Sequence, residues 1–195
     1  MKKLVLAVSF FTAIFTQKAQ AQDYYHGIGA QALFGSYGIS GELLGQTVDE
    51  TEYKLVPSIM YKATLGFELS RRKHFAVSAY PCVGFNYESN EFGSSSYFGY
   101  QLPILGELYL GDIDDQNFNV GLGLSYGSIS YDAESNGSVF GPIINIGGQL
   151  EVKDQLLGFR ASYTYGLNRD ADIKALGLTE SRSMIGLSVY YVIGQ

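Results

Sequence analysis

The chain contains eight segments in which apolar residues alternate with small or polar ones. The clearest covers 58–69, where every odd position is apolar and the even positions are mostly small, polar or charged. A period of two is the pattern of a β-strand with one apolar face. Pro81, Pro103 and Pro142 fall inside such segments and predict bulges or strand ends, because proline donates no ladder hydrogen bond. The predicted strands cover about 25–38, 57–70, 75–87, 97–110, 117–126, 140–152, 157–168 and 183–193.

The distribution of charge between the two faces of these strands favours a membrane barrel over a soluble one. The apolar faces hold no Asp, Glu, Lys or Arg, whereas the opposite faces carry Lys62, Glu68, Glu107, Glu151 and Arg160. A charge on a lipid-facing wall costs about 2–4 kcal/mol at mid-depth, so charges turn inward. A soluble barrel has large apolar residues inside and charges outside. We therefore predict an all-β fold, an eight-stranded antiparallel up-and-down transmembrane β-barrel that is closed to leave no unpaired edge in lipid.

The connections between these strands are alternately long and short. Short turns lie at 71–74, 111–116 and 153–155, and long loops rich in polar and small residues lie at about 40–56, 88–96, 130–138 and 169–181. Outer-membrane barrels keep short turns in the periplasm and longer loops outside. The pattern predicts a protein of the cell outer membrane with both termini periplasmic and four extracellular loops.

Residues 1–21 have the features of a cleaved secretory signal peptide, which leaves 22–195 as the barrel domain. Lys2 and Lys3 precede a short apolar stretch, and Ala19-Gln20-Ala21 offers a small-x-small cleavage site. The apolar stretch is shorter than the roughly 20 residues that a spanning helix needs.

The mature chain is acidic, which argues against binding to nucleic acid. Removal of the signal peptide takes away Lys2, Lys3 and Lys18 and leaves 10 Lys and Arg against 19 Asp and Glu. Such a charge repels a phosphate backbone. Cys82 is the only cysteine, so no internal disulfide is possible, and its place in a strand predicts a small buried thiol.

The residues that could carry chemistry predict no catalytic, cofactor or metal site. The only histidines, His26 and His74, are predicted at the periplasmic end of the barrel, on the wrong side for chemistry on outer-leaflet lipid. The acidic turn at 112–115 lacks the Gly and the distant Glu of a calcium loop. Gly121-x-Gly123 lies in a strand and leads into no helix, so it predicts no phosphate cradle.

The five inward charges allow two interpretations. Lys62, Glu68, Glu107, Glu151 and Arg160 could include a catalytic carboxylate pair, or they could form a salt-bridge network that fills the lumen. An eight-stranded barrel is only just wide enough for its own side chains, which favours the network. The turn after Val152 is expected to bring Glu151 across from Arg160, and that pair would be part of it.

Three short stretches resemble the outer-membrane β-barrel families of Bacteroidetes, namely the PorT-like group and its OmpX-like relatives. They are Gln101-Leu102-Pro103-Ile104-Leu105, Ala161-Ser162-Tyr163-Thr164-Tyr165-Gly166-Leu167-Asn168 and Arg182-Ser183-Met184-Ile185-Gly186-Leu187-Ser188-Val189-Tyr190-Tyr191, which are similar to the fourth, seventh and closing strands of that group. The resemblance implies an eight-stranded barrel inserted by the general outer-membrane assembly machinery. Members share no single activity, so it fixes no function.

These observations predict a monomeric, non-enzymatic barrel in contact with outer-membrane lipid, with a structural role or a surface-binding role through its four loops. Three alternatives remain open at this stage: a component of a secretion or envelope-assembly machine, a lipid-modifying enzyme, and a narrow pore for small solutes.

Overall fold

The computed structural model describes residues 23–43, 46–70, 73–90, 93–131, 135–167 and 171–193. The predicted signal peptide at 1–21 lies outside these residues. No helix in the described ranges is long and apolar enough to cross a membrane.

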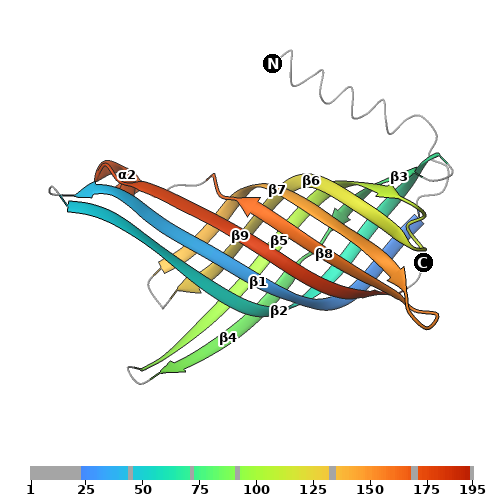
Figure 1. The fold of residues 1–195 in the computed structure, drawn as a ribbon, viewed down its shortest axis with the longest axis horizontal. Helices are drawn as coiled ribbons and strands as arrows, with labels where there is room; N and C mark the ends of the chain where they lie inside the picture. Colours follow the sequence, from blue (N-terminus) through green and yellow to red (C-terminus); the bar gives the residue numbers. More distant parts are fainter. Residues whose placement is uncertain are drawn as a thin grey trace, which may run out of the picture.

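One antiparallel sheet closes on itself to form a barrel (Figure 1). The strands are β1 (Asp23–Leu43), β2 (Gln46–Ser70), β3 (Lys73–Ala79), β4 (Cys82–Asn90), β5 (Gly93–Leu110), β6 (Asn117–Tyr131), β7 (Ser135–Glu151), β8 (Leu156–Tyr165) and β9 (Thr179–Val192), and the short helix α2 (Ala171–Ala175) precedes β9. The ring is complete because β1 pairs with both β2 and β9. Both β3 and β4 lie between β2 and β5, so they are two parts of one wall strand. The predicted eight-stranded up-and-down barrel is therefore confirmed.

Each of the three prolines lies where a strand ladder is interrupted. Pro81 lies at the break between β3 and β4. Pro103 lies opposite this break, where its carbonyl accepts from the Tyr80 amide at 3.3 Å. Pro142 lies one residue beyond the end of the β7–β8 ladder, which begins at Ile143. At each of these positions the missing N–H of proline costs the sheet no ladder hydrogen bond, so the wall of the barrel stays closed.

The apolar faces of the predicted strands form the outer wall of the barrel. Mid-strand side chains on this wall are between 48% and 69% exposed: Ile59, Leu102, Ile104, Leu122, Leu124, Ile144, Ile146, Leu187 and Val189. Aromatic side chains border this belt on both sides. Tyr100 contacts both Phe98 and Tyr126 on the side of the long connections, and Phe67 stacks on Phe75 near the short turns. Such girdles are typical of the two membrane interfaces.

The strands extend well beyond the apolar belt on one side, and this corrects the predicted loops. The β1–β2 ladder continues to the pair Leu43–Gln46, and the β4–β5 ladder continues to Asn90–Gly93. Much of 40–56, 88–96 and 130–138 is therefore paired strand, while 169–181 contains α2 and the start of β9. Apolar and polar residues do not alternate in these parts of the sequence, because both faces of a strand outside lipid meet water. The backbone ladder still forms there, since it needs no apolar face.

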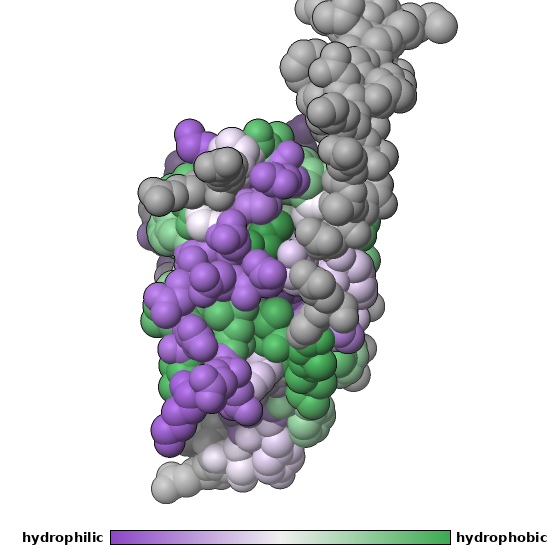
Figure 2. Space-filling model, turned by 90° about the vertical axis from the view of Figure 1, so that its right-hand side faces the viewer, coloured by the Kyte–Doolittle hydropathy of each residue, from purple (hydrophilic) through white to green (hydrophobic). Residues whose placement is uncertain are grey.

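The opposite end carries the short turns and both ends of the described chain (Figure 1). The β7–β8 turn is tight, with Lys153 and Asp154 at φ 53° and 62°. The backbone groups of Val152 and Gln155 bond to each other at 2.8 and 3.2 Å, which is the two-residue turn that suits the twist of a hairpin. Figure 2 views this end directly, and hydrophilic residues cross its face.

Candidate functional site

Three of the five predicted lumen charges lie inside the barrel. Lys62 on β2 and Glu107 on β5 are fully buried, and Arg160 on β8 is 3% exposed. The even-and-odd alternation of their strands turns these side chains inward. Glu68 and Glu151 are exposed, because both lie close to the short-turn end of their strands.

The expected Glu151–Arg160 pair is wrong. Glu151 lies across from Leu156, and Arg160 lies across from Gly147. The reason is the direction of the strands. Partner numbers run in opposite directions along an antiparallel hairpin, so the residues nearest the turn pair with one another.

The Glu107 carboxylate accepts hydrogen bonds from three neutral groups. Tyr80 donates its hydroxyl toward both carboxylate oxygens at 3.1 and 2.9 Å. Tyr109 donates to Oε2 at 2.9 Å, and the Asn145 amide donates to Oε1 at 2.7 Å. These bonds satisfy much of a buried anion's hydrogen-bonding capacity.

The two buried cations contact tyrosine rings. The Arg160 guanidinium carbon lies 4.1 Å from the centre of the Tyr80 ring. Lys62 Nζ lies 5.0 Å from the Tyr190 ring centre and 5.7 Å from that of Tyr109. Tyr80 and Tyr190 also meet edge to face, with centroids 6.2 Å apart. Aromatic faces attract desolvated cations, so the tyrosines hold both signs of charge: hydroxyls bind the carboxylate and rings bind the cations.

A glycine makes room for one of these rings. Gly158 is the cross-strand partner of Tyr190, and a Cβ at Gly158 would overlap the Tyr190 ring. We expect Gly158→Ala to lower the free energy of unfolding by about 1–3 kcal/mol, the usual cost of overpacking. Urea unfolding in detergent micelles measures it. Gly106→Ala is the control, because a Cβ there lies 3.3 Å from the Phe75 ring edge on the outer wall and needs only a small shift. Equal losses in the two variants would contradict this packing role.

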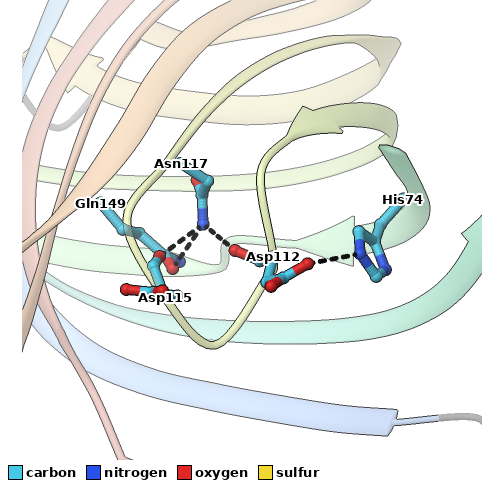
Figure 3. A network of polar contacts seen from close by, with 5 residues as sticks. All are labelled: His74, Asp112, Asp115, Asn117 and Gln149. Carbon is cyan, nitrogen blue, oxygen red and sulfur yellow. Dashed lines mark hydrogen bonds and ion pairs between the residues drawn. The ribbon is translucent and has the colours of Figure 1, made fainter. Parts of the chain in front are cut away.

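Lys62, Glu107 and Arg160, with the tyrosines around them, form the charged core of the barrel. On the short-turn side of this core, a network of polar groups closes the end of the barrel (Figure 3). Asn117 Nδ2 donates to the carbonyls of Asp112 and Asp115 at 2.8 and 3.0 Å, and to Gln149 Oε1 at 2.9 Å. His74 Nε2 lies 3.1 Å from Asp112 Oδ1. The acidic turn at 112–115 is therefore an internally bonded end of the barrel. Within the described ranges, no three His, Cys, Asp or Glu side chains are grouped to hold a metal ion.

The same turn inserts an apolar side chain into the barrel. Ile113 is 2% exposed and belongs to a buried cluster with Tyr25, Ala76 and Tyr109. The Gln149 amide lies between this turn and the charged core. In the opposite amide orientation, which gives up the bond from Asn117, the oxygen accepts from Lys62 Nζ at 2.6 Å and the nitrogen donates to the Ile113 carbonyl at 2.7 Å. The turn 111–116 thus plugs the barrel at this end.

An apolar layer fills the lumen on the other side of the charged core. Between the two layers, the Gln101 amide donates to Thr164 at 3.1 Å and accepts from Gln31 at 3.2 Å. The layer was not predicted, although large apolar residues on the inner face, such as Leu33 and Met60, were a visible signal. Its members are 0–4% exposed and comprise Leu33, Val56, Met60, Leu105, Ile129, Val139, Ile143 and Met184.

Charged groups lie beyond this layer, at the mouth of the barrel. Arg182 forms an ion pair with Glu180, which is only 2% exposed. Lys54 Nζ lies 2.8 Å from Glu52 and donates to the Tyr97 hydroxyl at 2.9 Å. The mouth is therefore crossed by bonded side chains from β2, β5 and β9.

The histidines form no catalytic arrangement in the described part of the chain. His26 faces the outer wall near the short-turn end, where Nδ1 lies 3.4 Å from the Tyr61 hydroxyl and its ring meets that of Tyr24 at 5.8 Å. His74 bonds to Asp112. Among the described residues, neither histidine has a hydrogen bond to a Ser or Cys side chain that could serve as a nucleophile. Cys82, expected to be a buried thiol, is free and 5% exposed.

The fold and its belt define a transmembrane eight-stranded β-barrel whose lumen is filled. No protein-family model matches the chain, and no curated protein matches it. Among solved structures, the chain is similar to outer membrane protein OprG from Pseudomonas aeruginosa (14% identity, 90% of this chain and 98% of that one, TM-score 0.48). It is also similar to Neisserial surface protein A (15%, 86% and 97%, TM-score 0.43) and to Ail, the attachment invasion locus protein of Yersinia pestis (12%, 89% and 100%, TM-score 0.42). These identities and scores are too low to transfer a role to this chain.

Proposed function

We propose that the protein is a non-enzymatic, monomeric barrel of the bacterial outer membrane, and that it binds a partner outside the cell through its extended hairpins. One observation carries the proposal: a continuous apolar belt surrounds the closed barrel, and paired polar strands project past the belt on one side only. The belt matches the hydrocarbon core of a membrane, and the projecting strands are available to partners in water.

The projecting part of β1 and β2 has the character of a binding surface. Glu42, Asp49, Glu50 and Glu52 are exposed along it, and Tyr53 is 74% exposed. A groove there is lined by Tyr37, Ile39, Glu50, Thr51 and Glu52. Carboxylates beside aromatic and aliphatic side chains suit a positively charged partner, since like charges would repel an acidic one.

The filled lumen favours this role over conduction. Tyr80, Tyr109, Tyr190 and Lys62 occupy the barrel interior with less than 3% exposure each. An eight-stranded barrel has no further width to offer a solute. Insertion would use the outer-membrane barrel assembly machinery, and the stretches at 101–105, 161–168 and 182–191 are the basis for relating the chain to PorT-like barrels of Bacteroidetes.

Single-cysteine labelling tests the orientation that the proposal requires. In a Cys82→Ser background, Thr51→Cys on the projecting hairpin is expected to react with a membrane-impermeant maleimide on intact cells. Asp154→Cys in the short β7–β8 turn is expected to react only after the outer membrane is permeabilised. Both wild-type side chains are exposed, so access to the reagent depends on the side of the membrane.

The wild-type protein, which keeps Cys82, is the control for background labelling, because the Cys82 thiol is 5% exposed. The reverse pattern, with Asp154→Cys labelled on intact cells, would contradict the proposed orientation. Equal labelling of both variants on intact cells would contradict a membrane-spanning barrel.

A further inference from the structure

Four residues form a continuous row on the inner wall across β6, β7, β8 and β9. Asn119 pairs with Gly147, Gly147 pairs with Arg160, and Arg160 pairs with Ser188. The three side chains of this row are 1%, 3% and 5% exposed, respectively. Gly147 contributes no side chain, and Asn119 Oδ1 lies 3.1 Å from the position that a Cβ at Gly147 would take.

The donors of this row have no acceptor in the described part of the chain. Within the described ranges, Arg160 Nε, Nη1 and Nη2, Asn119 Nδ2 and Ser188 Oγ have no hydrogen-bond partner. The Arg160 guanidinium carbon lies over the Tyr80 ring, and the N–H groups of a guanidinium lie in its own plane. Buried polar groups are nearly always bonded, and a buried Arg with every donor unbonded is a strong exception. The arrangement requires an acceptor from outside the chain.

The charges of the core indicate which kind of acceptor. The core holds the cations Lys62 and Arg160 and the single carboxylate of Glu107, which is a net charge of +1. Glu107 is occupied by bonds from Tyr80, Tyr109 and Asn145, and no ion pair joins it to either cation among the described residues. A water molecule would supply an acceptor but no charge. An anion supplies both.

We propose that the row Asn119–Gly147–Arg160–Ser188 binds one small monovalent anion of halide size, such as chloride. Arg160 is the principal donor to the anion, and Asn119 Nδ2 and Ser188 Oγ are its other donors. A monovalent anion neutralises the core, whose net charge is +1. This site is independent of the proposed outer-surface function.

Crystals of the protein refolded and grown in bromide test the site directly. We expect one anomalous bromide peak within hydrogen-bonding reach of the Arg160 guanidinium in the wild-type protein. An ordered water at that position in place of bromide, with no bromide peak in the lumen, would overturn the proposal.

Thermal unfolding in detergent gives a second readout. The wild-type midpoint is expected to rise as chloride replaces gluconate at constant ionic strength, because a ligand that binds only the folded state stabilises it. Arg160→Met is expected to abolish the rise. Lys54→Met is the matched control, because it removes a cation at the mouth, outside the charged core, and keeps the rise. A rise lost equally in both variants, or absent in the wild type, counts against a local anion site.

Discussion

Replacement of Glu107 by Ala is expected to lower the free energy of unfolding by about 3–5 kcal/mol, the usual cost of leaving buried charges without their counter-charge. Among the described residues, Glu107 is the only carboxylate in the core that also holds Lys62 and Arg160. Its loss also removes the acceptor for the hydroxyls of Tyr80 and Tyr109. Reversible urea unfolding in lipid vesicles or detergent, followed by tyrosine fluorescence, measures the change.

The matched control is Glu151→Ala. Glu151 belongs to the same set of predicted inward charges but is exposed, so its removal should change the free energy of unfolding by no more than about 0.5 kcal/mol, as at most surface positions. Adding Lys62→Met to Glu107→Ala should recover part of the loss, because one uncompensated cation is then gone. Equal effects of the two glutamate substitutions would mean that the charged core does not stabilise the barrel.

The second large effect is expected at the lipid-facing wall, where Leu122→Arg should cost about 2–4 kcal/mol in a bilayer. Leu122 is 69% exposed in the middle of β6, on the outer face. An exposed leucine in a soluble protein would tolerate arginine, since water solvates the charge. The measurement is unfolding in vesicles, where hydrocarbon surrounds this position.

Thr51→Arg is the control for this prediction, since Thr51 is exposed on β2 beyond the apolar belt. It should leave the free energy of unfolding in vesicles nearly unchanged. A Leu122→Arg variant as stable as Thr51→Arg would show that water, not lipid, surrounds β6.

The wall of the barrel could be predicted from sequence because lipid constrains every second residue of each strand. Ile59 and Leu65 on β2 face outward at 67% and 40% exposure, and Lys62 between them faces inward at 0%. The order of the strands followed from the short turns. Neither inference needs knowledge of distant contacts, since period and turn length are local properties.

The projecting hairpins could not be predicted in the same way. Outside lipid nothing requires an apolar face, so the extension of β1 to Leu43 and of β2 to Gln46 left no alternation to detect. The division of one wall strand at Pro81 was signalled by the proline. Its effect on the neighbouring strand required the register of Pro103 against the break.

The side-chain contacts within the charged core could not be predicted from the sequence. The inward direction of Lys62, Glu107 and Arg160 follows from their strands, but their contacts do not. Glu107 bonds to Tyr80, which is 27 residues away, and Lys62 lies over the ring of Tyr190. Such contacts across the lumen depend on the tilt and stagger of the strands, which hydrophobic periodicity does not report.

Separation of cell fractions, followed by gel electrophoresis with and without boiling, tests most directly whether the chain is a closed barrel in the outer membrane. We predict that the protein sediments with the outer membrane and that the unboiled band migrates faster than the boiled one, because the closed β-barrel stays folded and compact in detergent. A soluble periplasmic protein whose migration does not change on boiling would contradict a closed barrel in the outer membrane.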